Sequence, residues 1–443
     1  MSKLNDVVET VTEKVANAVE DVKARIGADG QDRRVLIDGF TEEGEDLSPL
    51  NETRQVLGGD SAKAHSHGGG EGLADSSRAG RMTSFNRADF GKLTGREEDW
   101  RFTPLKRLRG LHTKALDGAA PELAVVAPDG VLVEHVGRDD ARIGSAGIPE
   151  DLVAAAAWEA FTEATVVTIP EGVSVDGGVT LTVTGAGTDP AAQHLVIDAR
   201  ANSRAVVVLD HNGTGVLSQN VEVVVGDNAE LTVVSVQDWA DDAVHASAQY
   251  AVVGRDARFK HVAVSLGGDL VRITPSARFT APGGEVELYG LYYADAGQHL
   301  EQRLFVDHAV ANCKSNVLYK GALQGKDAHT VWVGDVLIRK EAEGTDTYEV
   351  NRNLLLTDGC RADSVPNLEI ETGLIEGAGH ASATGRFDDE HLFYLMARGI
   401  PEEAARRLVV RGFLNEIIQQ IKVPALEERL TEAVERELAA SEN

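Results

Sequence analysis

Four stretches, SRAVV (203–207), DNAEL (227–231), DARF (256–259) and GEV (284–286), share one pattern that indicates the fold. In each, a small residue at a turn precedes an alternating run, as in a strand with one buried face. Aligning Ala205, Ala229, Ala257 and Gly284 gives steps of 24, 28 and 27 residues. A repeat of this length and content is typical of stacked coils. We therefore predict a β-solenoid, in preference to a β-sandwich, whose turns would recur about every 8–12 residues.

The rest of the chain divides around this repeat. Residues 122–385 continue the short β-branched runs and form the predicted β-helix core. Residues 81–121, with the aromatic-rich stretch DWRFTPL (99–105), predict a helical or mixed lead-in that packs on the core. Residues 1–80 are acidic and rich in Gly and Ser, which predicts a largely flexible extension with one amphipathic helix at residues 4–26.

Residues 386–443 return to a helical period and predict a C-terminal helical domain. Pro401 suits the first turn of one helix, and Pro424 that of a last, acidic one. The apolar stripe from Ala404 to Ile421 is wider than packing on one side of a solenoid end requires. We therefore expect part of this stripe to be surplus to packing on the solenoid.

Composition limits the classes of function. With 43 basic and 71 acidic residues, the formal net charge of −28 disfavours nucleic acid and anionic membrane surfaces as partners. No apolar stretch is long enough to span a bilayer, and the N-terminus lacks the apolar region of a secretory signal. These features predict a cytoplasmic protein.

Chemistry-bearing residues are few. The chain has no P-loop, GxSxG, HExxH or GxGxxG motif. Cys313 and Cys360 cannot form a disulfide framework; each is a candidate reactive thiol or metal ligand, although a free cysteine is more commonly a small buried hydrophobe. His380 lies among small residues where the strands give way to the C-terminal helices. A neutral imidazole there is a candidate metal ligand, and the alternative is a histidine hydrogen-bonded at a tight turn.

A series of motifs carries a family resemblance. The segments are REEDWRFTPL (96–105), DH (307–308), NCKSN (312–316), YKG (319–321), NLLLTDG (353–359), PNLEI (366–370), GHASATGR (379–386) and LFYLMARGI (392–400). In this order, from about residue 83 to 422, they resemble the SufB/SufD family, the scaffolds of the Suf iron–sulfur cluster assembly system. The resemblance implies a right-handed parallel β-helix flanked by N-terminal and C-terminal helical regions.

Within the family the chain is similar to the SufD branch. The cysteine that SufB offers to nascent clusters corresponds to Asn351, and the glutamate after the shared histidine corresponds to Ala381. The histidine itself matches at His380, which implies a role in cluster assembly at the interface with SufB. Many SufD proteins have a cysteine two residues earlier, where this chain has Ala378.

The resemblance also implies partners and cofactors. A SufB-like paralogue would pair along the β-helix, and a SufC-like ABC-type ATPase would dock on the C-terminal helices, with Phe393, Leu408, Phe413 and Ile417 as candidate contacts. No cofactor would be held by this chain alone, while a transient iron–sulfur cluster would form at the SufB interface. Reduced flavin is associated with the assembled complex in this family, although the chain has no flavin fingerprint.

The function expected from the resemblance is that of a non-catalytic scaffold subunit of a SufBCD-type complex, which assembles clusters for transfer to apoproteins. The alternative is a β-solenoid polysaccharide lyase or hydrolase, which would need carboxylates or a basic cluster in an open groove. The acidic composition and the few aromatic residues disfavour that alternative.

Overall fold

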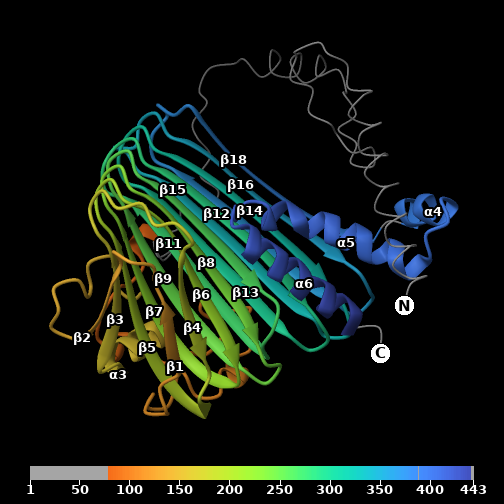
Figure 1. Ribbon diagram of the computed structural model, residues 1–443, viewed down its shortest axis with the longest axis horizontal. Helices are drawn as coiled ribbons and strands as arrows, with labels where there is room; N and C mark the ends of the chain where they lie inside the picture. Colours follow the sequence, from red (N-terminus) through yellow and green to blue (C-terminus); the bar gives the residue numbers. More distant parts are fainter. Residues whose placement is uncertain (1–77, 388, 441–443) are drawn as a thin grey trace, which may run out of the picture. The chain divides into compact units, whose positions relative to one another are not determined.

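The computed structural model describes residues 78–387 and 389–440, and these residues form one compact unit (Figure 1). It is mainly β, and its core is a β-solenoid of about 8 turns. The predicted fold class is therefore confirmed. The helix predicted at residues 4–26 lies outside the described residues.

Two nine-stranded sheets form the walls of the solenoid. Sheet A contains β1 (Glu122–Val126), β4 (Val179–Thr184), β6 (Arg204–Gly213), β8 (Glu230–Trp239), β10 (Arg258–Ser265), β12 (Glu285–Ala294), β14 (Lys314–Leu323), β16 (Asp346–Leu355) and β18 (Gly377–Arg386). Sheet B contains β2 (Leu132–Gly137), β3 (Glu163–Ile169), β5 (Gly187–Ala199), β7 (Gly215–Val225), β9 (Val244–Val253), β11 (Leu270–Phe279), β13 (His299–His308), β15 (His329–Ile338) and β17 (Arg361–Ile370). From β3 onward, successive strands alternate between the sheets, and each pairs in parallel with the strand two further on.

The turns repeat with the predicted small residue, but the first step of the alignment was wrong. The amide of Arg258 donates to the carbonyl of Ala229 (2.8 Å), and the amide of Glu285 donates to that of Ala257 (2.9 Å). At the same place in the preceding coil the carbonyl belongs to Ser203, which accepts from Glu230 (2.8 Å). Ala205 instead pairs with Leu231, because it already lies inside β6. From β6 to β18 the coils advance by 26, 28, 27, 29, 32 and 31 residues.

The lead-in and the helix α3 (Leu152–Ala160) cover the outside of sheet B. Trp100, Leu108 and Leu111 are buried against side chains of β7, β9 and β11, as expected for the aromatic-rich stretch. The helical part of the lead-in reduces to short 3-10 turns at Arg78–Gly80, Arg87–Asp89 and Leu105–Leu108. Repeated glycines and Pro104 explain why no α-helix forms there.

Three C-terminal helices follow β18: α4 (Asp389–Ala397), α5 (Glu402–Ile418) and α6 (Pro424–Ala440). In Figure 1, α5 and α6 lie across the strands of sheet A. Their apolar side chains pack on the outward face of that sheet, which includes Val234, Val264 and Leu291. Within the described ranges no helix combines the length and apolar character needed to cross a membrane.

The interior of the solenoid is mainly apolar in the first coils, includes buried polar side chains such as Gln219, Gln237 and Gln249 in the middle coils, and is polar at β16. Valine, leucine and isoleucine dominate the early coils, and the inward-facing residues of β16 are Thr347, Glu349, Asn351 and Asn353, all buried. Because inward positions alternate along a strand, the residues paired with them on β18 also face inward. These residues are Ala378, His380, Ser382 and Thr384.

Candidate functional site at the open end of the solenoid

The two sheets end at β18 and β17, and no strand in the described part of the chain pairs with their outer edges. Side chains of β18 from His380 to Thr384 are exposed, although residues at the same inward positions of β16 are buried. Unpaired N–H and C=O groups at a sheet edge are ready to pair with another chain. We call this end of the solenoid the open end; at the other end β1 and β2 pair antiparallel with β4 and β3 and are the outermost strands.

His380 projects from this open end over the buried carboxyl group of Glu349. The two residues are register partners on β18 and β16, and His380 Nδ1 lies 3.7 Å from Glu349 Oε1. The His380 side chain is 43% exposed, whereas that of Glu349 is completely buried. An imidazole in this position can reach an incoming ligand, as a metal-binding histidine must.

Glu349 has an unusual environment for a carboxyl group. Neither of its oxygen atoms has a hydrogen-bond partner. Burial, together with the negative charge of Asp335, raises the pKa of Glu349 to about 8. A Cβ atom at Gly334 on β15 would lie 2.3 Å from Glu349 Oε2, so only glycine leaves room for this carboxyl group.

Beside Glu349, an amide network fills the rest of the last coils. Asn353 donates to Asn351 (2.8 Å), to Ser364 on β17 (2.9 Å) and to Thr384 on β18 (3.2 Å). The hydroxyl of Tyr292 donates to Asn353 (2.7 Å) and accepts from Asn351 (2.8 Å). Asn351 is thus a fully buried structural amide.

Ala378 and Ala381 lie on opposite faces of β18. Ala378 faces inward, on the same side as His380, and packs against the core, so a cysteine there would lie beside the histidine. Ala381 is exposed and faces outward. A glutamate at that position would not point toward His380 from within this chain.

The two cysteines occupy different environments, and neither adjoins His380 in sequence or register. Cys313 is buried at the small-residue turn position, where its carbonyl accepts from the amide of Asp346 (3.2 Å). Burial raises the pKa of the Cys313 thiol, which disfavours the reactive thiolate. Cys360 is partly buried at the turn before β17, with its sulfur 3.3 Å from the carbonyl oxygen of Gly325.

The candidate ATPase contacts separate into exposed and buried groups. Phe393 on α4 is 73% exposed, and Leu408 on α5 is exposed as well. Phe413 is partly buried, with Lys320 Nζ 4.6 Å from the centre of its ring, and Ile417 is completely buried against sheet A. The interpretation of the α5 stripe as surplus was wrong, because sheet A and α6 cover most of it.

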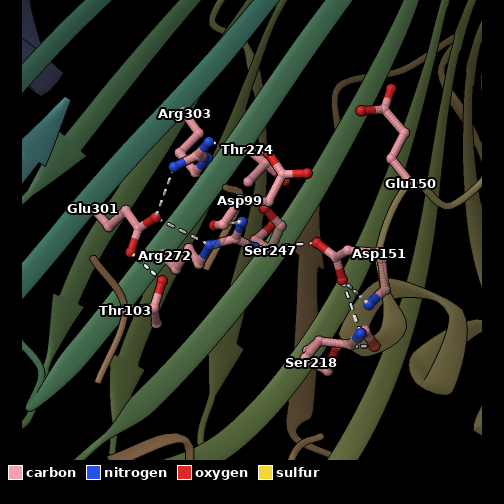
Figure 2. Close-up of polar contacts among 12 residues, drawn as sticks. Asp99, Thr103, Glu150, Asp151, Ser218, Ser247, Arg272, Thr274, Glu301 and Arg303 are labelled. Carbon is pink, nitrogen blue, oxygen red and sulfur yellow. Dashed lines mark hydrogen bonds and ion pairs between the residues drawn. The ribbon is translucent and has the colours of Figure 1, made fainter. Parts of the chain in front are cut away.

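A second polar cluster, which the sequence did not reveal, lies between sheet B and the lead-in (Figure 2). Arg272 on β11 bridges Glu301 on β13 (3.3 Å) and Asp151 before α3 (3.1 Å). Thr103 donates to Glu301 (2.6 Å), and Arg303 pairs with Asp99 (3.0 Å). These contacts attach the lead-in and α3 to the sheet.

Glu301 is the central anion of this cluster. Burial alone would raise its pKa, but a hydrogen bond from His299 and the two guanidinium groups hold the pKa of Glu301 well below its usual range. Arg272, His299 and Thr103 all form hydrogen bonds with Glu301 from within the chain. The cluster is therefore a structural ion network, in contrast to the unpaired carboxyl group of Glu349.

Glu349 also escaped the sequence analysis. Two features of the sequence point to Glu349. It occupies an inward-facing position of β16, and it precedes His380 by 31 residues, the length of one coil. In the described part of the chain, no cluster of three or more His, Cys, Asp or Glu side chains could hold a metal ion. Any ion bound near His380 therefore needs further ligands from water or from another molecule.

These features define an open-ended parallel β-solenoid with one exposed histidine at its unpaired end. Residues 182–413 match the family model described as SUF system FeS cluster assembly, SufBD core domain. The chain belongs to the SufBD family of iron–sulfur cluster assembly proteins.

Relatives within the family show how far the similarity extends. The chain is 58% identical over 374 residues to the iron-sulfur cluster assembly SufBD family protein of Mycobacterium bovis, covering 82% of this chain and 93% of the relative. A Mycobacterium leprae protein of the same description is 56% identical over 370 residues, covering 82% and 94%. The iron-sulfur cluster assembly protein SufD of Bacillus subtilis is 26% identical over 277 residues, covering 61% and 63%. These matches do not favour the polysaccharide lyase or hydrolase alternative.

Proposed function

We propose that this chain is a non-catalytic scaffold subunit of a SufBCD-type complex, which assembles iron–sulfur clusters for transfer to apoproteins. The observation that carries the proposal is the open end of the solenoid, where His380 is exposed beside two unpaired strand edges. A β-solenoid normally protects its terminal coil with a polar cap. A terminal coil without a cap, carrying an exposed histidine that can bind a metal ion, is compatible with an interface at which a cluster forms.

The partner at this end would be a SufB-like chain of the same fold. The edges of β17 and β18 offer main-chain hydrogen-bond groups on both walls of the solenoid. A second solenoid can extend both sheets at once, whereas a single peptide can extend only one. The cluster would then be a transient cargo held between His380 and ligands of the partner.

A SufC-like ABC-type ATPase would dock on the C-terminal helices. Phe393, Tyr394 and Met396 on α4, with Leu408 on α5, are exposed large apolar side chains within a short span of sequence. An apolar group of this kind on a protein surface commonly marks a protein–protein contact. The ATPase would supply the energy, so this chain needs no turnover of its own.

Other parts of the proposal concern cofactors and surroundings. In this proposal the chain alone holds no resident cofactor. Reduced flavin, where it is present, would bind to the assembled complex. The net charge of −28 supports protein partners over nucleic acid or anionic membrane surfaces. The proposed compartment is the cytoplasm, where glutathione keeps both cysteines reduced.

An anaerobic pull-down tests the proposal. The tagged full-length chain, expressed at native level, should retain a paralogous β-solenoid chain and an ABC-type ATPase, both identified by mass spectrometry. A variant carrying Phe393→Ser and Leu408→Ser should lose the ATPase and keep the paralogue, because the two contacts lie on different parts of the chain. Recovery of the wild-type chain alone, at low salt, would refute the scaffold proposal.

A further inference from the structure

The carboxyl group of Glu349 is the strongest unexplained feature of the molecule. Its side chain is completely buried, and neither oxygen atom has a hydrogen-bond partner. Buried carboxyl groups are ordinarily hydrogen-bonded, ion-paired or bound to a metal ion. Glu301, equally buried, shows the ordinary solution, with two arginines and a threonine around it.

The imidazole of His380 lies close to Glu349, in a geometry that does not fit a hydrogen bond. The separation of 3.7 Å between Oε1 and Nδ1 exceeds hydrogen-bonding distance. Two ligands that each lie about 2.0–2.2 Å from a tetrahedral ion are roughly 3.3–3.6 Å apart. A small side-chain adjustment therefore brings both atoms onto one metal ion.

The residues around Glu349 leave space beside its carboxyl group and do not supply a cationic partner. Gly334 leaves room at Oε2, and the nearby charged side chain, Asp335, is an anion that Arg78 and Asn367 already bind. No lysine or arginine in the described residues forms an ion pair with Glu349, so a cation that binds and deprotonates this carboxyl group would come from outside the chain. Imidazole and carboxylate ligands together suit divalent first-row transition metals.

We propose that Glu349 and His380 form a two-ligand site for a divalent first-row metal ion at the open end of the solenoid. The buried carboxylate and the exposed imidazole hold the ion from one side, and water or partner side chains complete its coordination. The choice of Fe²⁺ as the natural ion rests on the proposed function. The site itself rests on the geometry of this chain.

Titration with Co²⁺ tests the site, because its d–d absorption reports ligand binding directly. The full-length chain is purified without metal, alone or with whatever partners it retains, and titrated with Co²⁺ in the absence of oxygen. We expect the wild type to bind one ion per chain and Glu349→Gln or His380→Ala to bind at least about tenfold more weakly. Glu376→Gln is the matched control, because that carboxylate is exposed at the turn before β18.

Two results would overturn the inference. One is equal Co²⁺ binding by wild type and Glu349→Gln, whose folding is checked by circular dichroism. The other is the absence, in Co²⁺-soaked crystals, of an anomalous scattering peak between Nδ1 of His380 and the carboxyl group of Glu349. Retention of partners without Co²⁺ binding would reject this site and leave the scaffold proposal intact; Co²⁺ binding without partners would do the reverse.

Discussion

The absence of a side chain at Gly321 on β14 lets a tyrosine from one coil form hydrogen bonds with residues two coils further on. The ring of Tyr292, on β12, passes over Gly321 and places its hydroxyl group on Asn351 and Asn353 of β16. A Cβ atom at Gly321 would lie 1.8 Å from Tyr292 Cε2. The glycine is thus required by the amide network of the terminal coils.

We predict that Gly321→Ala destabilises the protein by about 2–4 kcal/mol, through displacement of the ring and loss of its buried hydrogen bonds. Urea unfolding followed by circular dichroism measures the change. Gly385→Ala on β18 is the control, since a Cβ atom there has no neighbour within 4 Å. Equal stability of the two variants would show that the ring can move aside without cost.

At the scale of single elements, α6 carries a carboxyl group, that of Glu437, whose ionisation makes the stability of the protein depend on pH. Burial, and then the charges of Asp238, Asp241 and Asp295, raises the pKa of Glu437 to about 7. The folded chain therefore holds a proton that the unfolded chain releases near pH 4.5. Stability falls as pH rises from about 4.5 to 7, and above that range the penalty is complete.

We predict that Glu437→Gln removes this pH dependence and raises stability at pH 8 by about 1 kcal/mol, a value reduced for the partial exposure of the side chain. Thermal unfolding at several pH values provides the measurement. Glu432→Gln on the same helix is exposed and should leave the profile unchanged. A wild-type profile in the Glu437→Gln variant would contradict the assignment.

The lead-in is the other element whose attachment can be tested. Glu301 is the anion shared by Arg272, Arg303 and Thr103 beneath it. We expect Glu301→Gln to cost about 3 kcal/mol, because two buried guanidinium groups lose their common partner. Trypsin should then cleave the lead-in faster, for example after Arg96 or Arg101.

The control for this variant is Glu285→Gln, which removes a surface ion pair with Arg258 and should change stability by less than about 0.5 kcal/mol. If Glu301→Gln kept both the wild-type stability and the wild-type cleavage rate, the ion network would not hold the lead-in. Asp99 and Asp151 would then be sufficient partners for the two arginines.

Across the whole molecule, the sequence predicted the solenoid because small residues recur at its turns and strands alternate between them. It predicted the first step incorrectly, because Ser203 and Ala205 are both small and only one ends the turn. The ion network could not be predicted, since Arg272 and Glu301 occupy outward positions that usually face solvent. Only the folded lead-in buries them.

The candidate site was predictable in part for a similar reason. His380 lies in a motif that can be read directly, whereas Glu349 meets it only through the register of two strands a full coil apart. Coil lengths vary along this chain, so the pairing could not be derived by counting residues. The interpretation of the α5 stripe failed for another reason, because its width was judged without sheet A and α6, which cover most of it.

The six coil lengths from β6 to β18 are all different, and this limits how the gene can change. Identical tandem coils can be duplicated or lost by recombination with little structural penalty, because every coil fits every other. Here a lost coil would set turns of unequal length against each other and shift His380 by one strand spacing, about 4.8 Å. The length of the solenoid between its two ends is thus resistant to gain or loss of a coil, because coils of unequal length cannot replace one another.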